Sequence, residues 1–242
     1  MQPSNRLART AGVLYLIIIV SGIFAQFFVR MSLIDPTDAA ATAAAVRGAE
    51  SLFRVGIAAD LVMIAADVAI ALAFFVLLEP VGRALSLLAA FFRLVQATIL
   101  GFNLMNLFLG LELLTGGAGP LGAVREGERQ SLALMFFEAH ATGYAVGLAF
   151  FAFSLFLLGV LIYRSGYLPK VLAVLLMIAS GGYLADTLAR TLLTDYAAVQ
   201  SIFDAVVFGP AVIAEVATAL WLLVGGVRTP PVPRPAAVAA TD

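Results

Sequence analysis

The chain has 242 residues, of which 62% are hydrophobic and only 12% charged, and its mean hydropathy is +1.05. A soluble domain is nearer to half apolar and a quarter charged, so this composition indicates an integral membrane protein. The net charge of −1 and the lack of a basic cluster exclude nucleic-acid binding, because phosphates need lysine and arginine to neutralise them. The absence of cysteine excludes disulfides and thiolate chemistry, and a single histidine excludes a multi-histidine centre, so we expect no metal and no cofactor.

Long apolar runs predict an all-α protein, a bundle of six transmembrane helices, since about 20 apolar residues are enough to cross a bilayer. The first run resembles a signal peptide, but it is long and no small-residue cleavage site follows, so we interpret it as an anchor. In chain order the predicted spans are residues 11–28, 53–78, 85–111, 131–163, 169–193 and 202–226. We expect one domain over residues 1–228 and a proline-rich, disordered tail at 229–242.

The distribution of arginine and lysine between the loops predicts the orientation of the chain. With the N-terminus inside, the cytoplasmic side holds seven basic residues and the outer side five, so both termini are expected in the cytoplasm. In the first outer loop, Asp35 precedes Pro36, and alanine-rich sequence follows up to Gly48. This pattern predicts a short surface helix that Asp35 caps.

A faint internal repeat relates the two halves of the chain. Residues 66–72 (ADVAIAL) align with residues 214–220 (AEVATAL), and residues 20–22 (VSG) align with residues 179–181 (ASG). The halves run in the same direction, which indicates a parallel repeat of helical hairpins. Chance similarity in alanine- and leucine-rich sequence is an equal alternative.

Six acidic residues lie within or at the ends of the predicted spans, together with two arginines and the histidine. A charged side chain in hydrocarbon costs about 3 kcal/mol or more, so it normally faces a partner or a water-filled cavity. The residues are Asp60, Asp67, Glu138, Asp186, Asp204, Glu215, Arg93, Arg190 and His140. Polar residues share one helical face in three spans: Asp60 with Asp67, Asp204 with Glu215, and Arg93 with Gln96, Asn103 and Asn106. The sequence therefore predicts a polar interior in the bundle.

Asp67, Arg93 and Glu215 are expected at a similar depth, in the middle or inner half of the bilayer, from a rise of about 1.5 Å per residue. We expect these three side chains to form one ion-paired or hydrogen-bonded group. Its simplest role is to lock the helices together, and the alternative is to bind a ligand or a proton. Pro210 is expected to kink the sixth span beside this group.

The outer half is predicted to hold a second set of polar side chains. Asp186 and Arg190 are four residues apart with the acid first, which favours a local salt bridge over a ligand role. Glu138 and His140 point about 200° apart on one helix, so they cannot jointly ligate a metal. His140 shares a face with Tyr144, and we expect it to be buried beside a carboxylate, with proton sensing as the alternative.

Five motifs along the chain carry a likeness to a known family. They are residues 8–16 (ARTAGVLYL), 52–61 (LFRVGIAADL), 92–97 (FRLVQA), 140–144 (HATGY) and 163–169 (YRSGYLP). Together they resemble a bacterial multi-pass membrane family known as domain of unknown function number 4386, over roughly residues 5–226. The resemblance implies a multi-pass protein of the bacterial cytoplasmic (inner) membrane with about six spans. It implies no substrate or reaction, and it assigns no functional residues.

Three hypotheses of function follow. The first is a transporter-like or sensor-like module in the lipid bilayer that binds a small polar ligand, a lipid head group or a proton. The second is a structural membrane subunit whose polar groups only fix helix packing. The third and weakest is an intramembrane enzyme that uses carboxylates and His140, because the sequence has no nucleophile motif, metal set or nucleotide loop. The candidate binding or proton-handling residues are Asp60, Asp67, Arg93, Gln96, Asn103, Glu138, His140, Tyr144, Asp186, Arg190 and Glu215.

Overall fold

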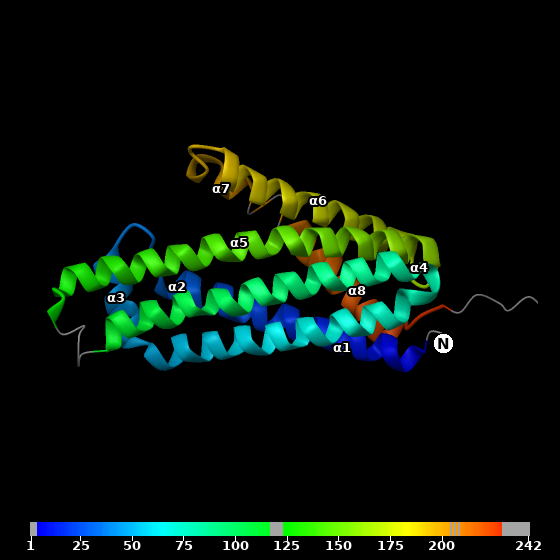
Figure 1. The fold of residues 1–242 in the computed structure, drawn as a ribbon, viewed down its shortest axis with the longest axis horizontal. Coiled ribbons are helices and arrows are strands. Elements are labelled where there is room, and N and C mark those ends of the chain that lie inside the picture. The colour runs from blue at the N-terminus through cyan, green and yellow to red at the C-terminus, as the bar shows by residue number, and fades with distance from the viewer. Residues whose placement is uncertain (1–3, 117–122, 204, 206, 208, 229–242) are drawn as a thin grey trace, which may run out of the picture.

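The regular secondary structure is entirely helical over the residues that the computed structural model describes, which are 4–116, 123–203, 205, 207 and 209–228. The helices lie along one another in an elongated bundle (Figure 1). In this part of the chain, four helical segments are long and apolar enough to cross a membrane: Asn5–Leu33, Glu50–Thr115, Glu126–Ser165 and Lys170–Leu192. The predicted all-α class is confirmed, and the apolar helices fit a membrane protein.

The first helical segment is longer than the predicted span. α1 (Asn5–Ile23) begins after Ser4, whose hydroxyl accepts a hydrogen bond from a main-chain amide of the first turn at 3.1 Å. The segment continues into η1 (Phe24–Arg30), which is π-helical, and into α2 (Met31–Leu33). A π-helical turn holds an extra residue and so rotates the side chains that follow it around the helix axis. Arg30, the last residue of η1, is buried in the bundle.

A short helix follows, as predicted, but it begins later than expected. α3 (Ala39–Gly48) is capped by Asp38, whose carboxylate accepts a hydrogen bond from the amide of Ala41 at 2.9 Å. The prediction that Asp35 is the cap is wrong. Asp35 instead closes a turn, in which it accepts hydrogen bonds from the hydroxyl and the amide of Thr37 at 2.7 and 2.8 Å. These hydrogen bonds hold the pKa of Asp35 below its ordinary value.

α4 (Glu50–Thr115) folds back on itself to form two antiparallel arms (Figure 1). Gly82, two residues after Pro80, has extended backbone angles (φ 178°, ψ 92°), and the helix reverses direction there. Asp67 and Arg93 are 26 residues apart and yet form an ion pair at 2.6 Å. In a straight helix they would be about 39 Å apart. The two arms correspond to the second and third predicted spans.

α5 (Glu126–Ser165) and α6 (Lys170–Leu192) form the next antiparallel pair. Gly166, in the left-handed region (φ 65°), ends α5, and Pro169 precedes the first turn of α6. With 40 residues, α5 is about 60 Å long, twice the hydrocarbon thickness of a bilayer. α5 and both arms of α4 therefore extend beyond α6 at one end of the bundle (Figure 1).

The structure describes two helices in the region of the last predicted span. They are α7 (Ala197–Phe203) and α8 (Gly209–Val224), with π-helical backbone at Ala205 and Val207 between them, and the predicted kink at Pro210 stays a prediction because residues 204, 206 and 208 lie outside the described part of the chain. The described part of α8 has 16 residues, fewer than the roughly 20 that cross a bilayer as a helix, and residue 208 directly before it lies outside the described part. The count of six spans and the internal repeat therefore stay predictions. Asp204 and the tail at 229–242 lie outside the described residues.

The two ends of the described chain meet at one end of the bundle. The side-chain oxygen of Asn5 accepts a hydrogen bond from the amide of Val227 at 2.9 Å. The amide of Arg228 donates to the carbonyl of Tyr167 at 3.0 Å, so the turn between α5 and α6 lies beside both ends. A cytoplasmic location for these ends stays a prediction.

Two apolar cores are stacked along the bundle. The larger core lies between α1, α4, α5, α6 and α8 and includes Tyr15, Ile70 and Leu155. The smaller core lies where α3 packs against α4 and α5, and it includes Phe53 and Phe137. On α4 and α5, the residues between these two cores in the sequence carry most of the predicted polar groups.

Candidate functional site

A group of buried polar side chains between the two cores is centred on Arg93. Its Nη2 lies 2.6 Å from Oδ1 of Asp67, and its Nε donates to the same oxygen at 2.9 Å. Gln96 donates to the other oxygen of Asp67 at 3.2 Å. The guanidinium carbon also lies 5.6 Å from the ring centre of Tyr15 and 5.0 Å from that of Phe151. The carboxylate and the two rings together offset part of the cost of burying this charge.

Glu215 joins this group from α8, as predicted, but it is not ion-paired to Arg93. Tyr183 of α6 donates its hydroxyl to Oε1 of Glu215 at 2.8 Å, and the hydroxyl of Tyr15 lies close enough to interact with the same carboxylate. Among the described residues, no lysine or arginine lies within salt-bridge distance of Glu215. The predicted group of three is thus an Asp67–Arg93 pair with Glu215 beside it.

A cavity of about 120 Å³ opens between these side chains. α4, α5, α6 and α8 supply its polar lining, which consists of Asp67, Gln96, Tyr144, Tyr183 and Glu215. The remaining lining comes from α1, α4, α5 and α8 and consists of apolar side chains and the backbone of Gly22. An apolar cavity of about 150 Å³ is large enough for benzene, so this one holds a few water molecules or a ligand of about five heavy atoms.

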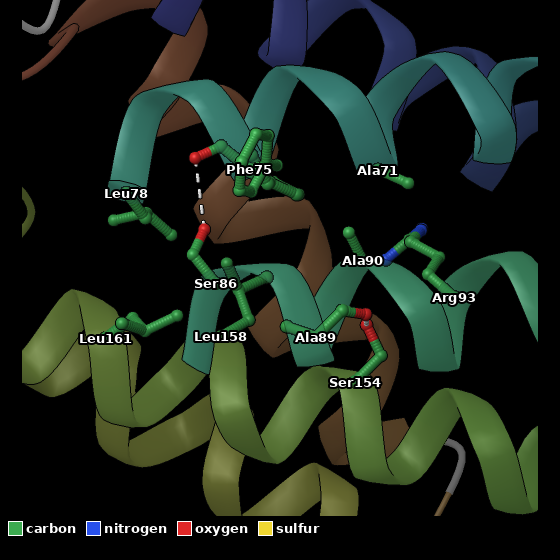
Figure 2. Close-up of a pocket in the computed structure, with 11 residues that line it drawn as sticks. Ala71, Phe75, Leu78, Ser86, Ala89, Ala90, Arg93, Ser154, Leu158 and Leu161 are labelled. Atoms are coloured by element: carbon green, nitrogen blue, oxygen red, sulfur yellow. Dashed lines mark hydrogen bonds between the residues drawn. The ribbon is translucent and has the colours of Figure 1, made fainter. Parts of the chain in front are cut away.

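A second, much smaller hollow lies between Arg93 and the turn of α4. Figure 2 shows it between the two arms of α4 and α5, with Arg93 at its edge. The hydroxyls of Ser86 and Ser154 donate to main-chain carbonyls there at 3.0 and 2.8 Å, so both are satisfied (Figure 2). Its volume of about 10 Å³ is close to the minimum for one water molecule, which is too small for any other ligand.

A second polar layer lies on the opposite side of the cavity, next to the smaller core. Nη1 of Arg30 is 2.5 Å from Oδ2 of Asp60, and Nε of Arg30 donates to the side-chain oxygen of Gln26 at 2.9 Å. Arg30 was not predicted as a site residue, because the first span was expected to end at residue 28. Asp60 gave a usable signal: a buried acid needs a base at similar depth, and Arg30 is the first one beyond that predicted end.

His140 is buried in this layer, but its partner is an amide. Nδ2 of Asn103 lies 3.1 Å from Nδ1 of His140 and donates to the His140 carbonyl at 2.8 Å. The prediction of a neighbouring carboxylate is therefore wrong: burial required a polar partner and did not specify which kind. The ring of Tyr144 lies 6.1 Å from the imidazole and 5.8 Å from the guanidinium carbon of Arg30. Because Tyr144 also lines the cavity, it joins this layer to the cavity.

Three further candidates lie away from the cavity. Glu138 is exposed on the surface of α5. Asp186 and Arg190 form the predicted pair along α6, with Nε and Oδ2 3.0 Å apart. Tyr196 donates to Oδ1 of Asp186 at 2.5 Å, and its ring centre lies 4.3 Å from the guanidinium carbon of Arg190. These contacts hold Tyr196 against the C-terminal part of α6, and packing alone explains them.

The structure thus brings Asp67, Gln96, Tyr144 and Glu215 to the cavity. Arg93 is paired with Asp67 but does not line the cavity. Tyr183 was not predicted, because a tyrosine in an apolar run is common and has no distinctive spacing. Within the described part of the chain, no three His, Cys, Asp or Glu side chains are grouped closely enough to hold a metal ion.

Comparison with known proteins identifies the family. The sequence profile of the family described as domain of unknown function (DUF4386) matches residues 10–226, and the chain belongs to this family. A relative from Archaeoglobus fulgidus, titled "Uncharacterized protein", is 34% identical over 160 residues, which cover 66% of this chain and 76% of the relative. No solved structure matches the chain. A bacterial inner-membrane location stays a prediction.

Proposed function

We propose that this member of the DUF4386 family binds a small polar ligand or a proton in its intramembrane cavity, as a transporter-like or sensor-like module. The observation that carries the proposal is the cavity of about 120 Å³, to which four helices contribute five polar side chains. Polar groups that only hold a bundle together would pack against one another and leave no hollow. A polar hollow among apolar helices needs an occupant that forms hydrogen bonds with its lining.

The volume of the cavity limits the occupant. About five heavy atoms fit, which is fewer than a phospholipid head group contains. A small polar molecule or a proton therefore fits this cavity better than a lipid head group does.

Glu215 is the group that a purely structural role explains least. Asp67 has its charge balanced by Arg93 at 2.6 Å, and this pair is sufficient to hold the two arms of α4 together. Glu215 lines the cavity and has phenols, not a base, beside it. A carboxylate inside a membrane is costly unless it takes up a proton or a cation. We therefore assign ligand or proton binding to Glu215 and a positioning role to the Asp67–Arg93 pair.

Single cysteines can test whether water reaches the cavity, because the chain has no cysteine of its own. Val212 lines the cavity, whereas its neighbour Ile213 is 67% exposed on the outer surface of the bundle. In lipid vesicles we expect Val212→Cys to react with a small water-soluble thiol reagent and Ile213→Cys to be protected by lipid. If neither variant reacts while both react after unfolding in detergent, the cavity is closed to water and the proposal is wrong.

A further inference from the structure

The class of ligand follows from the hydrogen-bonding groups that the cavity leaves open, and this step rests on the function proposed above. Gln96 is 4% exposed, and its amide nitrogen donates to Asp67. An ionised carboxylate can only accept, so with Asp67 paired to Arg93 the amide faces Asp67 with its nitrogen, which leaves Oε1 for other partners. This buried oxygen has no hydrogen-bond partner among the described residues, and Gln96 lines the cavity. A bound molecule with a donor would satisfy it.

Glu215 adds a second acceptor to the same cavity. Its carboxylate can accept about four hydrogen bonds. Tyr183 provides one of them at 2.8 Å, and Tyr15 lies nearby. The part of Glu215 that lines the cavity can therefore accept from a ligand as well.

The two arginines beside the cavity are each paired with a carboxylate and neither lines the cavity, although Nη1 of Arg93 and Nη2 of Arg30 form no hydrogen bond with the described residues. Arg93 is bound to Asp67 and lies against the rings of Tyr15 and Phe151, and it does not line the cavity. Arg30, in the neighbouring layer, is bound to Asp60. With Asp67, Arg93 and Glu215 ionised, the group around the cavity carries one net negative charge. An anionic ligand would add a second negative charge, whereas a cation would neutralise the first.

The aromatic lining favours the same class of ligand. Tyr144, Phe151 and Tyr183 contribute to the wall of the cavity, and the faces of aromatic rings attract cations. A proton on Glu215 would remove the charge but would leave Oε1 of Gln96 without a donor. We propose that the cavity is a site for a small cation with N–H donors, no larger than guanidinium, with Glu215 as its counter-ion and Oε1 of Gln96 as an acceptor.

Guanidinium and urea are a matched pair of probes, because both are planar and have the same number of heavy atoms, and only guanidinium is charged. Isothermal titration calorimetry of the full chain in lipid nanodiscs would compare guanidinium, methylammonium, urea and sodium chloride at millimolar, non-denaturing concentrations. We expect guanidinium or methylammonium to bind at one site per chain, and urea and sodium to give no signal.

Two variants locate the site. Glu215→Gln should lower the affinity for guanidinium roughly thirtyfold or more, as expected for the loss of one partner of a buried charge pair. Gln96→Leu keeps Glu215 and removes the acceptor, so it should lower the affinity less and provides the test if Glu215→Gln does not fold. Glu138→Gln is the control, because it makes the same chemical change on the exposed surface of α5 and should leave the affinity unchanged.

The outcomes separate the ligand class from the proposed function. Urea binding as tightly as guanidinium would overturn the cation assignment and leave ligand binding in place. Guanidinium binding that neither Glu215→Gln nor Gln96→Leu weakens would also overturn it. If no probe binds but Val212→Cys is labelled, the cation assignment fails and the proposed function stands. If no probe binds and Val212→Cys is not labelled, both fail.

Discussion

Arg93 carries a positive charge inside the bundle, with 2% of its side chain exposed and Asp67 as its ion-pair partner. Replacing Arg93 by leucine would leave Asp67 as an uncompensated buried charge, so we expect the free energy of unfolding to fall by about 3–5 kcal/mol. The control is Arg83→Leu, whose side chain is 77% exposed and whose pair with Glu79 contributes at most about 1 kcal/mol. Denaturation followed by circular dichroism in one detergent would measure both. Equal losses would show that Arg93 is not in a buried pair.

The role of the pair can be separated from its stability by removing both charges. Arg93→Met combined with Asp67→Leu leaves no unpaired charge, so we expect most of the stability lost in Arg93→Leu to return. If the pair only positions its neighbours, guanidinium should still bind to Glu215 in this double variant, more weakly because Gln96 has lost its partner. Complete loss of binding in a folded double variant would mean that Asp67 contacts the ligand directly.

Single residues of the site could be predicted where their chemistry is unusual for their surroundings. Asp67 and Glu215 stand out because a carboxylate in an apolar run needs a partner or a cavity. Arg30 could be sought only indirectly, through the need of Asp60 for a base, because it lies beyond the predicted end of the first span and the π-helical segment that it ends leaves no mark in the hydrophobic pattern. Tyr183 is equally inconspicuous, and its role depends on α8 lying beside α6, which no local pattern indicates.

At the scale of helices, α1 and α8 approach each other closely at Gly12. A Cβ atom on Gly12 of α1 would lie 2.8 Å from the backbone nitrogen of Leu223 and 2.9 Å from the carbonyl oxygen of Ala219, both in α8. Backbone cannot move aside as a side chain can, so Gly12→Ala should separate the helices and lower the stability by about 1–3 kcal/mol. Gly101→Ala meets nothing within 4 Å, and we expect it to be neutral or to stabilise by up to about 1 kcal/mol. Thermal denaturation of the two variants measures the difference, and equal midpoints would contradict the close approach.

The helices themselves were largely predictable, and their ends were not. Apolar runs located the arms of α4 and the α5–α6 pair, and Pro80 and Gly166, residue types that interrupt helices, lie at the turns between them. The cap of α3 was misplaced because Asp35 and Asp38 both precede alanine-rich sequence, and only the turn at Thr37 decides between them.

At the scale of the whole molecule, the described ends and the turns near Gly82 and Gly166 gather at one end of the bundle, and α3 lies at the other (Figure 1). We predict that an impermeant thiol reagent labels cysteines at Ser4, Arg83 and Arg164 from the cytoplasmic side, and a cysteine at Ala44 from the opposite side. Intact cells and inverted vesicles provide the two directions, and a permeant reagent controls for expression. Labelling of the Arg83 and Arg164 positions from opposite sides would contradict the arrangement.

The arrangement of the helices around the cavity could not be derived from the sequence. Periodicity shows that Asp67 and Glu215 each lie on a polar face, but it does not show which helices are neighbours. Contacts between distant segments decide this, such as Tyr183 with Glu215 across 32 residues and Asn103 with His140 across 37 residues. The cavity exists only once these contacts have formed.

The fold of α4 has a consequence for biogenesis. Asp67 and Arg93 lie on the two arms of one hairpin, so the acid meets its base within a single stretch of nascent chain. An arm carrying Asp67 alone would enter the lipid against a cost of about 3 kcal/mol. We expect the arms to leave the translocon together, because the counter-charge on the second arm lowers the free-energy cost of placing the first arm in lipid. We therefore expect the hairpin to be integrated before ribosomes have synthesised α5, and the later helices to assemble around a charge that is already neutralised.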